Sequence, residues 1–171
     1  MKLGLVGSEM CIRDRSYTGL RIGVAAAKGL CFSLDIPLIS ISTLLILSKQ
    51  IKISSGLIVP VLDARRDEVY SAIYDVNYKL VKEESPEIID NISFDNYSKD
   101  NEIYFIGSGQ KKCKELIESN SNLIFYNKET YPSSKEMAEI SYQKFLSSEF
   151  EDLAYFEPAY LKNFILDSVN R

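Results

Sequence analysis

The chain has 171 residues, of which 46% are hydrophobic, and its 20 Lys and Arg against 24 Asp and Glu give a formal net charge of −4. This length and composition fit one globular domain or part of a larger one, and the negative charge argues against unaided binding to nucleic acid or to an anionic membrane. The chain contains no histidine, which excludes Ser-His-Asp and Cys-His nucleophiles and His-ligated metal sites.

The first predicted element is a helix over residues 18–34. Four apolar residues recur there with a helical period: Leu20, Val24, Ala27 and Cys31. Ser16 or Thr18 can serve as the N-cap. Small residues make the helix thin on several sides, so another helix or a sheet can approach it closely. We therefore expect this helix to be buried or to lie in an interface.

A proline predicts the end of this helix. Pro37 cannot continue a helix and biases the residue before it towards extended geometry. Residues 38–41 are interpreted as a short buried strand. Ser42 then follows as the predicted N-cap of a second helix over residues 43–49.

A hairpin is predicted next. Residues 56–63 are an apolar run typical of a central strand, and residues 68–74 alternate like the second arm of a hairpin. Residues 78–81 can extend this meander. The polar stretch over residues 82–100 is interpreted as a surface excursion that carries a short helix.

The second half of the chain continues to alternate strands with helices. Strands are predicted over residues 103–106 and 122–126, and helices over residues 110–119 and 133–146. Ser133 is the expected N-cap of the last helix, because Glu136 follows it at the spacing of a capping box. Interleaved strands and helices with one hairpin indicate an α/β architecture with a mixed sheet.

The cysteines and the apolar segments predict the compartment. Cys11, Cys31 and Cys113 are odd in number and far apart, which fits a reducing compartment rather than a disulfide framework. The longest apolar stretch, residues 24–47, is interrupted by charges and a proline, so no membrane helix is expected. The apolar run within residues 1–7 is too short for a secretion signal. We therefore expect a cytoplasmic protein without membrane contact.

One glycine motif is a candidate phosphate-binding site. Gly107, Ser108 and Gly109 lie between a predicted strand and a predicted helix, where backbone N–H groups can hold a phosphate, and lysines follow them. The motif lacks the third glycine of a dinucleotide-binding fingerprint and the Gly-Lys-Ser/Thr of a P-loop. We favour a tight turn followed by a solvated lysine face, and phosphate binding stays as the alternative.

Charged and thiol side chains supply the other candidates for chemistry. Asp63 begins a cluster of alternating charge at the hairpin tip, where carboxylates could bind magnesium. We favour pairing of these charges with one another or with a partner. Cys31 lies on the apolar face of the first helix and is expected to be a buried structural thiol. Lysines beside Cys113 could lower its pKa, but without a histidine base we expect no catalytic role.

Four blocks of sequence resemble a known family. Residues 16–30, SYTGLRIGVAAAKGL, closely resemble the signature loop and helix of the TsaB (YeaZ) family, the bacterial partner subunits in making threonylcarbamoyladenosine on tRNA. The other matching blocks are residues 36–44, 62–70 and 158–161. The resemblance implies an actin-like, sugar-kinase-like fold of two lobes. It assigns residues 16–50 to a remnant of the N-terminal lobe and residues 51–171 to the second lobe with the C-terminal tail.

The resemblance also implies that a metal site has been lost. The related catalytic subunit TsaD carries two metal-binding histidines in an H-x-x-x-H motif, and the corresponding residues here are Thr43 and Leu47. A hydroxyl and an aliphatic side chain cannot replace two imidazoles. The resemblance therefore implies no catalytic residue, no metal, no cofactor and no metallopeptidase activity.

The implied role is to hold a TsaD-like catalytic subunit in a competent state, for modification of ANN-decoding tRNAs. Helices of the N-terminal lobe in this family pair with a second copy or with TsaD, and residues 18–34 correspond to one of them. The candidate contact residues are Tyr17, Leu20, Arg21, Val24 and Lys28. A TsaE-like ATPase is the other implied partner, and tRNA is reached only through the complex.

The start of the chain departs from the family. Residues 1–15 lack its leading phosphate-loop-like strand, and residues 8–15 resemble a translated sequencing-adapter remnant. We therefore interpret residues 1–15 as foreign and the chain as an N-terminally truncated member. The apolar faces of the first helix and of the strand at residues 38–41 should then be exposed, which favours self-association.

Two rival functions stay open. The chain could be a small ATP- or phosphate-binding enzyme of the sugar-kinase superfamily that uses Asp63 and the Gly107–Gly109 motif, and calorimetry with Mg-ATP would reveal this. It could also bind tRNA directly, which a strongly salt-dependent tRNA shift would reveal.

Overall fold

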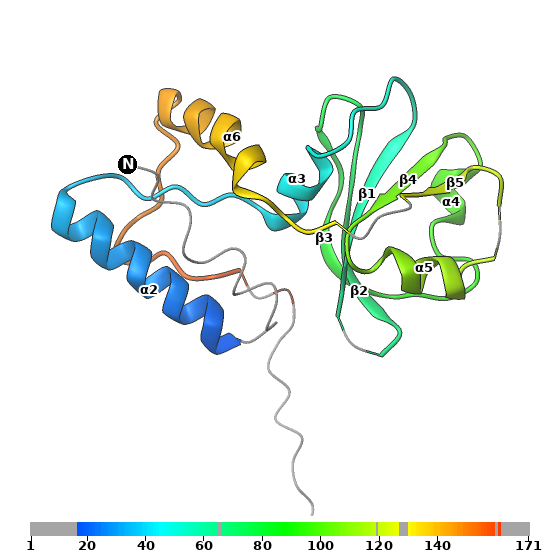
Figure 1. Cartoon of the computed structure of the whole chain (residues 1–171), viewed down its shortest axis with the longest axis horizontal. Helices are drawn as coiled ribbons and strands as arrows, with labels where there is room; N and C mark the ends of the chain where they lie inside the picture. Colours follow the sequence, from blue (N-terminus) through cyan, green and yellow to red (C-terminus); the bar gives the residue numbers. More distant parts are fainter. Residues whose placement is uncertain (1–16, 65, 119, 127–129, 160, 162–171) are drawn as a thin grey trace, which may run out of the picture.

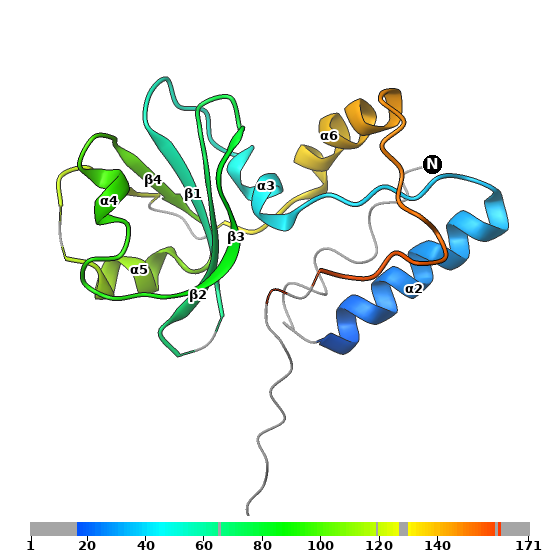
Figure 2. The same cartoon turned by 180° about the vertical axis from the view of Figure 1, so that it is seen from behind.

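The computed structural model describes residues 17–64, 66–118, 120–126, 130–159 and 161, so residues 1–15 lie outside the described part. The elements in chain order are α2 (Tyr17–Leu34), α3 (Thr43–Ser48), β1 (Leu57–Asp63), β2 (Glu68–Tyr74), β3 (Leu80–Ile88), α4 (Asp95–Ser98), β4 (Ile103–Ile106), α5 (Gln110–Leu116), β5 (Leu123–Phe125) and α6 (Ser134–Leu146). Figures 1 and 2 show two regions. We call β1–β5 with α3, α4 and α5 the sheet module, and α2, α6 and residues 147–159 the helical arm.

The sheet module is built on one mixed sheet with the strand order β3-β2-β1-β4-β5. β2 pairs antiparallel with β1 and with β3, whereas β4 pairs parallel with β1 and with β5. The first two strands form the predicted hairpin, with Leu62 opposite Tyr70. The predicted α/β architecture with a mixed sheet is confirmed.

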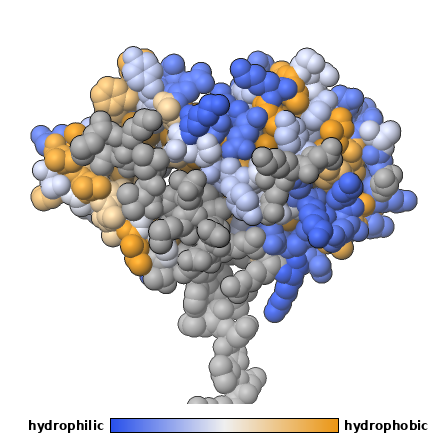
Figure 3. Space-filling view, in the orientation of Figure 1, coloured by the Kyte–Doolittle hydropathy of each residue, from blue (hydrophilic) through white to orange (hydrophobic). Residues whose placement is uncertain are grey.

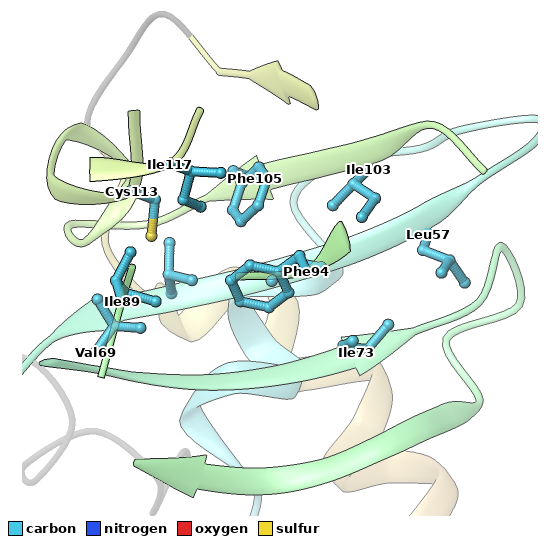
Figure 4. Packing of buried hydrophobic residues seen from close by; sticks show 11 residues of the cluster. Leu57, Val69, Ile73, Ile89, Phe94, Ile103, Phe105, Cys113 and Ile117 are labelled. Atoms are coloured by element: carbon cyan, nitrogen blue, oxygen red, sulfur yellow. The ribbon is translucent and has the colours of Figure 1, made fainter. Parts of the chain in front are cut away.

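The central strand β1 is apolar along its length because both faces of the sheet are covered. Successive side chains of a strand point to opposite faces. Val59 joins a cluster with Phe105 and Cys113 on the face covered by α4 and α5 (Figure 4), whereas Ile58 joins a cluster with Leu47 of α3 on the other face. A doubly covered strand reads as a continuous apolar run, as this one does.

Serine N-caps begin two of the helices, as the sequence predicts. The Ser42 hydroxyl accepts from the N–H groups of Leu44 and Leu45 at 3.1 and 3.2 Å and starts α3. The Ser133 hydroxyl accepts from the Lys135 N–H at 3.2 Å and starts α6. Glu136 contacts the Ser133 hydroxyl at 2.5 Å, so the expected Ser/Glu pair forms through the two side chains.

Two stretches differ from the sequence prediction. Residues 38–41 form no strand, since the only pairing there is an isolated bridge between Leu38 and Glu151 within the described chain. A strand needs a partner strand along its edge, and among the described residues this segment has only the bridge at Leu38. Conversely, β3 (Leu80–Ile88) continues the meander predicted to reach residue 81, so residues 82–88 are strand rather than surface excursion; α4 supplies the short helix expected in that stretch.

The charged residues of β3 explain why its sequence does not indicate a strand. In the described part of the chain, β3 lies at the edge of the sheet and pairs with β2 alone, with Pro86 opposite Tyr70. An edge strand tolerates proline and charged side chains, which also discourage pairing with other chains. Its sequence therefore resembles a polar loop.

Candidate functional site

Helix α2 presents much of its apolar surface to solvent. Five of its large apolar side chains are exposed, by fractions between 37% and 81%: Leu20, Ile22, Leu30, Phe32 and Leu34. Cys31 is buried, and a side chain added at Gly29 would meet no atom within 4 Å. Figure 3 shows hydrophobic side chains gathered on the α2 side of the molecule. The predicted exposure of the helix face is confirmed, and α2 is not buried within the described chain.

The segment after α2 is covered, contrary to expectation. Leu38 is only 8% exposed, residues 39–41 are half-buried, and Leu38 forms a bridge with Glu151. The Glu151 N–H donates to the Leu38 carbonyl at 2.9 Å. Of the two apolar segments expected to be exposed, α2 is exposed and residues 38–41 are largely covered.

The five predicted contact residues all lie on α2, in different surroundings. Leu20 and Arg21 are exposed, whereas Val24 and Lys28 are half-buried. Leu20, Val24 and Lys28 succeed one another at the four-residue spacing that places side chains on one side of a helix. Tyr17 is the first residue of α2, and its side chain lies outside the described part.

Lys28 makes its bonds inside the chain. Its Nζ donates to the carbonyls of Ala154 at 2.9 Å and of Phe156 at 3.2 Å. Sequence reasoning missed this C-terminal segment. Asp152 was the one local signal, because Asp side chains often accept from N–H groups two and three residues later.

The glycine motif joins α5 to β1. Gly107 has φ +116°, and a Cβ there would lie 2.2 Å from the carbonyl oxygen of Val61, so only glycine fits. The Gly109 N–H donates to that same oxygen at 3.0 Å, and the Ser108 hydroxyl accepts from the Asp63 N–H at 3.3 Å. The Gly109 N–H and the Ser108 hydroxyl thus stabilise a tight turn against β1, which is the favoured interpretation of this motif.

The charges at the hairpin tip pair within the chain. Lys112 Nζ contacts the Asp63 carboxylate and donates to the Glu68 carbonyl at 2.9 Å. Among the described residues no group of three or more acidic or thiol side chains is placed to hold a metal ion. Lys111 and Lys114 are exposed, so the lysine face is solvated apart from Lys112.

Cys113 is inert despite its lysine neighbours. It is fully buried, and burial raises the pKa of its thiol to about 12, while the nearby Lys112 charge lowers it by less. Lys112 thus acts in the expected direction, but desolvation disfavours the thiolate more strongly, so the net change is a raised pKa. Cys31 is 3% exposed and confirms the expected buried thiol.

Helix α3 carries Thr43 and Leu47 at the two positions where a metal site would need ligands. Leu47 is fully buried in the cluster on the α3 face of the sheet, and Thr43 is half-buried in the first turn. At the N-terminus of α3, the Ser42 hydroxyl contacts the Glu84 carboxylate. Burial, and secondarily the Glu84 charge, raise the pKa of the adjacent Tyr74 to about 12. These polar contacts attach α3 to β3.

An open depression of about 290 Å³ lies beside the C-terminal half of α5. Its lining residues are Lys114, Ile117, Glu118, Asn120, Leu123 and Phe125. The glycine motif precedes the opposite end of α5, so the depression and the motif do not form one site. In the part of the chain that the structure describes, the helices lack the combined length and hydrophobicity of a membrane span.

Comparison with known proteins places these features in a family. The family model described as TsaD: tRNA N6-adenosine threonylcarbamoyltransferase matches residues 16–166. The chain is 32% identical over 155 residues to the tRNA threonylcarbamoyladenosine biosynthesis protein TsaB of Bacillus subtilis (strain 168), with 86% of this chain covered. It is 28% identical over 157 residues to TsaB of Escherichia coli (strain K12), again with 86% covered. The chain spans 65% of the B. subtilis protein and 67% of the E. coli protein.

Solved structures agree on the fold. A Pseudomonas aeruginosa protein described as similar to peptidase YeaZ superposes with a TM-score of 0.72 at 20% identity, covering 86% of this chain and 69% of that one. YeaZ from P. aeruginosa superposes with a TM-score of 0.70 at 20% identity, covering 85% and 69%. The actin-like α/β fold class predicted from the sequence is confirmed.

Proposed function

Because the chain belongs to the family of TsaD, tRNA N6-adenosine threonylcarbamoyltransferase, and is related to TsaB proteins, we propose that it is a non-catalytic subunit for threonylcarbamoyladenosine synthesis on ANN-decoding tRNAs. It binds and supports a TsaD-like catalytic subunit in the cytoplasm and works with a TsaE-like ATPase. It reaches tRNA only through this complex. Residues 16–50 belong to the family's N-terminal lobe and residues 51–171 to the second lobe.

The exposed apolar face of α2 is the observation that carries this proposal. Ile22 and Phe32 are 65% and 81% exposed, although a free helix face of this kind is costly in water. Exposed apolar side chains on a helix are a usual means by which the helix docks on a partner. The occupant is the TsaD-like subunit, with a second copy of this chain competing for the same face.

The chain's own residues support a role without catalysis. It has no histidine, and Thr43 and Leu47 replace the ligand pair of a TsaD-like metal site. Asp63 is paired with Lys112, and the Cys113 thiol has its pKa raised to about 12. None of these groups is prepared to act as a nucleophile or a base at neutral pH.

Replacement of the α2 anchors tests the proposal. Leu20→Arg alone, and with Ile22→Arg, should weaken binding to a purified TsaD-like subunit at least about thirtyfold in calorimetry, because both side chains are exposed on α2. Ile92→Arg is the matched control, since Ile92 is 61% exposed outside α2. Circular dichroism verifies that the variants stay folded. Unchanged affinity in the Leu20 variants would overturn the proposal.

The rival functions predict different binding. The Gly109 N–H and the Ser108 hydroxyl already bond to β1, which favours the subunit over an ATP-binding enzyme. We expect no measurable Mg-ATP binding by this chain alone. A direct tRNA-binding module would give a tRNA shift that weakens steeply with salt, and the charge of −4 opposes it.

A further inference from the structure

Residues 152–156 form a single hydrogen-bonded turn beside α2. The Asp152 carboxylate accepts from the N–H groups of Ala154 at 2.8 Å and Tyr155 at 3.0 Å. The Phe156 N–H donates to the Asp152 carbonyl at 2.8 Å. This is the bonding of a first helical turn with Asp as its N-cap. The N–H groups are thus satisfied within the turn, while its last carbonyls need donors from elsewhere.

Helix α2 supplies that donor. Lys28 Nζ donates to the carbonyls of Ala154 and Phe156 at 2.9 and 3.2 Å. An ammonium group at the carbonyl end of a helical turn acts as a C-cap, because it bonds unsatisfied acceptors and opposes the local dipole. α2 therefore closes a turn that lies far away in the sequence.

A second attachment holds the beginning of the same segment. The Glu151 N–H donates to the Leu38 carbonyl at 2.9 Å, and the Ser40 hydroxyl donates to the Glu151 carboxylate. Leu38 and Ser40 belong to the connection from α2 to α3, and α3 packs on β1. Residues 151–156, which we call the strap, thus bind both α2 and the connection that leads to the sheet module.

The strap compensates for the shallow packing of α2. Leu30 and Leu34, in the C-terminal half of the helix, are exposed, and Cys31 is the buried residue of that half. The position of the helix therefore depends on polar bonds more than on an apolar core. Lys28 makes two of these bonds with a single side chain.

We propose that Lys28 is a positioning residue, which fixes α2 through the strap and thereby supports partner binding without touching the partner. The bonds between Lys28 and the strap form within this chain and need no partner. Its effect on binding rests on the proposed function. Lys28 thereby moves from the predicted contact set to the support of that surface, whereas Leu20 stays a contact.

The test compares three variants of the full chain. Lys28→Met keeps the aliphatic stem and removes the donor, Lys28→Arg restores a donor, and Lys52→Met is a control at an exposed lysine before β1. Hydrogen exchange should show the Ala154, Tyr155 and Phe156 amides exchanging about tenfold faster in Lys28→Met, because a charge-assisted bond is lost. Lys28→Arg and Lys52→Met should keep the original rates.

Binding to the TsaD-like subunit separates the two proposals. We expect the affinity to fall about tenfold in Lys28→Met and to recover in Lys28→Arg. Unchanged amide exchange in Lys28→Met would overturn the claim that Lys28 stabilises the strap. Faster exchange with unchanged affinity would overturn the positioning role. Weaker partner binding by Lys28→Met with unchanged exchange of the strap amides would show that Lys28 contacts the partner directly, which also contradicts the positioning role. Failure of Leu20→Arg to affect binding would instead refute the proposed function while leaving the strap intact.

Discussion

The sheet module and the helical arm differ in how they are held together. The sheet module buries Val59, Phe105 and Ile106 completely, on both faces of a five-stranded sheet. In the arm, α6 contributes no buried residue and α2 contributes Cys31 within the described chain. A region with its own closed core can fold alone, whereas a region held by polar bonds and exposing apolar side chains is suited to a partner.

The difference should set the sensitivity of each region to mutation. Large-to-small changes in a closed core cost the transfer energy of the lost atoms and the cavity left behind. The same change on an exposed helix removes little contact, and surface substitutions usually stay within about 0.5 kcal/mol. Stability measurements on matched variants, one in the sheet module and one in the helical arm, therefore test this difference.

The largest effect is expected at Phe105. Its ring packs edge-on against Phe94, with ring centroids 5.2 Å apart, and stacks on Phe125, with ring centroids 4.7 Å apart. Phe105→Ala should lower the free energy of unfolding by about 3–5 kcal/mol in urea denaturation. Phe145→Ala on α6, where the ring is 53% exposed, is the control and should cost about 0.5 kcal/mol or less. Equal losses would show that the arm shares the core of the sheet module.

The next effect is expected at the joint between β1 and α5. Gly107→Ala places a Cβ against the Val61 carbonyl at φ +116°, so the backbone must move. We expect a loss of about 1–3 kcal/mol, measured by thermal unfolding. Ser108→Ala keeps the backbone geometry and should cost about 1 kcal/mol by loss of one hydrogen bond. Unchanged stability of Gly107→Ala would mean that the backbone of the turn can move to accept the Cβ.

Alkaline pH should weaken the sheet module. Burial raises the Cys113 pKa from 9.0 to about 12, so the unfolded chain loses this proton before the folded chain does. The stability that the neutral thiol contributes is complete below pH 9 and declines as pH rises towards 12, by up to about 1.4 kcal/mol per pH unit. Tyr74, raised from 10.0 to about 12, adds a further decline above pH 10.

Urea denaturation from pH 7.5 to 11 measures this slope. Cys113→Ala removes the contribution of the thiol and should flatten the decline between pH 9 and 10, although its stability at neutral pH is lower because of the cavity. An unaltered slope in this variant would show that another group titrates.

Local patterns in the sequence predicted most of the sheet module. The apolar run of β1, the alternation of β2 and the N-caps Ser42 and Ser133 each act within a few residues, and the structure confirms them. β3 was missed because its place at the edge of the sheet permits charged side chains. The apolar pattern of residues 38–41 predicts a strand, but a local pattern does not reveal whether a neighbouring strand exists.

The candidate site was predictable only in its local part. Helical period located α2 and its apolar face, but the bonds from Lys28 join residues 126 and 128 positions apart. No short-range pattern predicts such a pair. The pKa of Cys113 likewise depends on its burial in the sheet module, which neighbouring lysines in the sequence do not reveal.

The smallest effect is expected at Gly29, and it tests the independence of the two regions most directly. A Cβ there meets nothing within 4 Å, and alanine favours a helix over glycine by about 0.5–1 kcal/mol. Gly29→Ala should therefore slow amide exchange in α2 a few-fold while the exchange of β1 and β4 stays unchanged. If the whole chain instead gained stability, α2 would unfold together with the sheet. Weaker binding to a TsaD-like subunit despite the firmer helix would mean that the partner packs against this glycine.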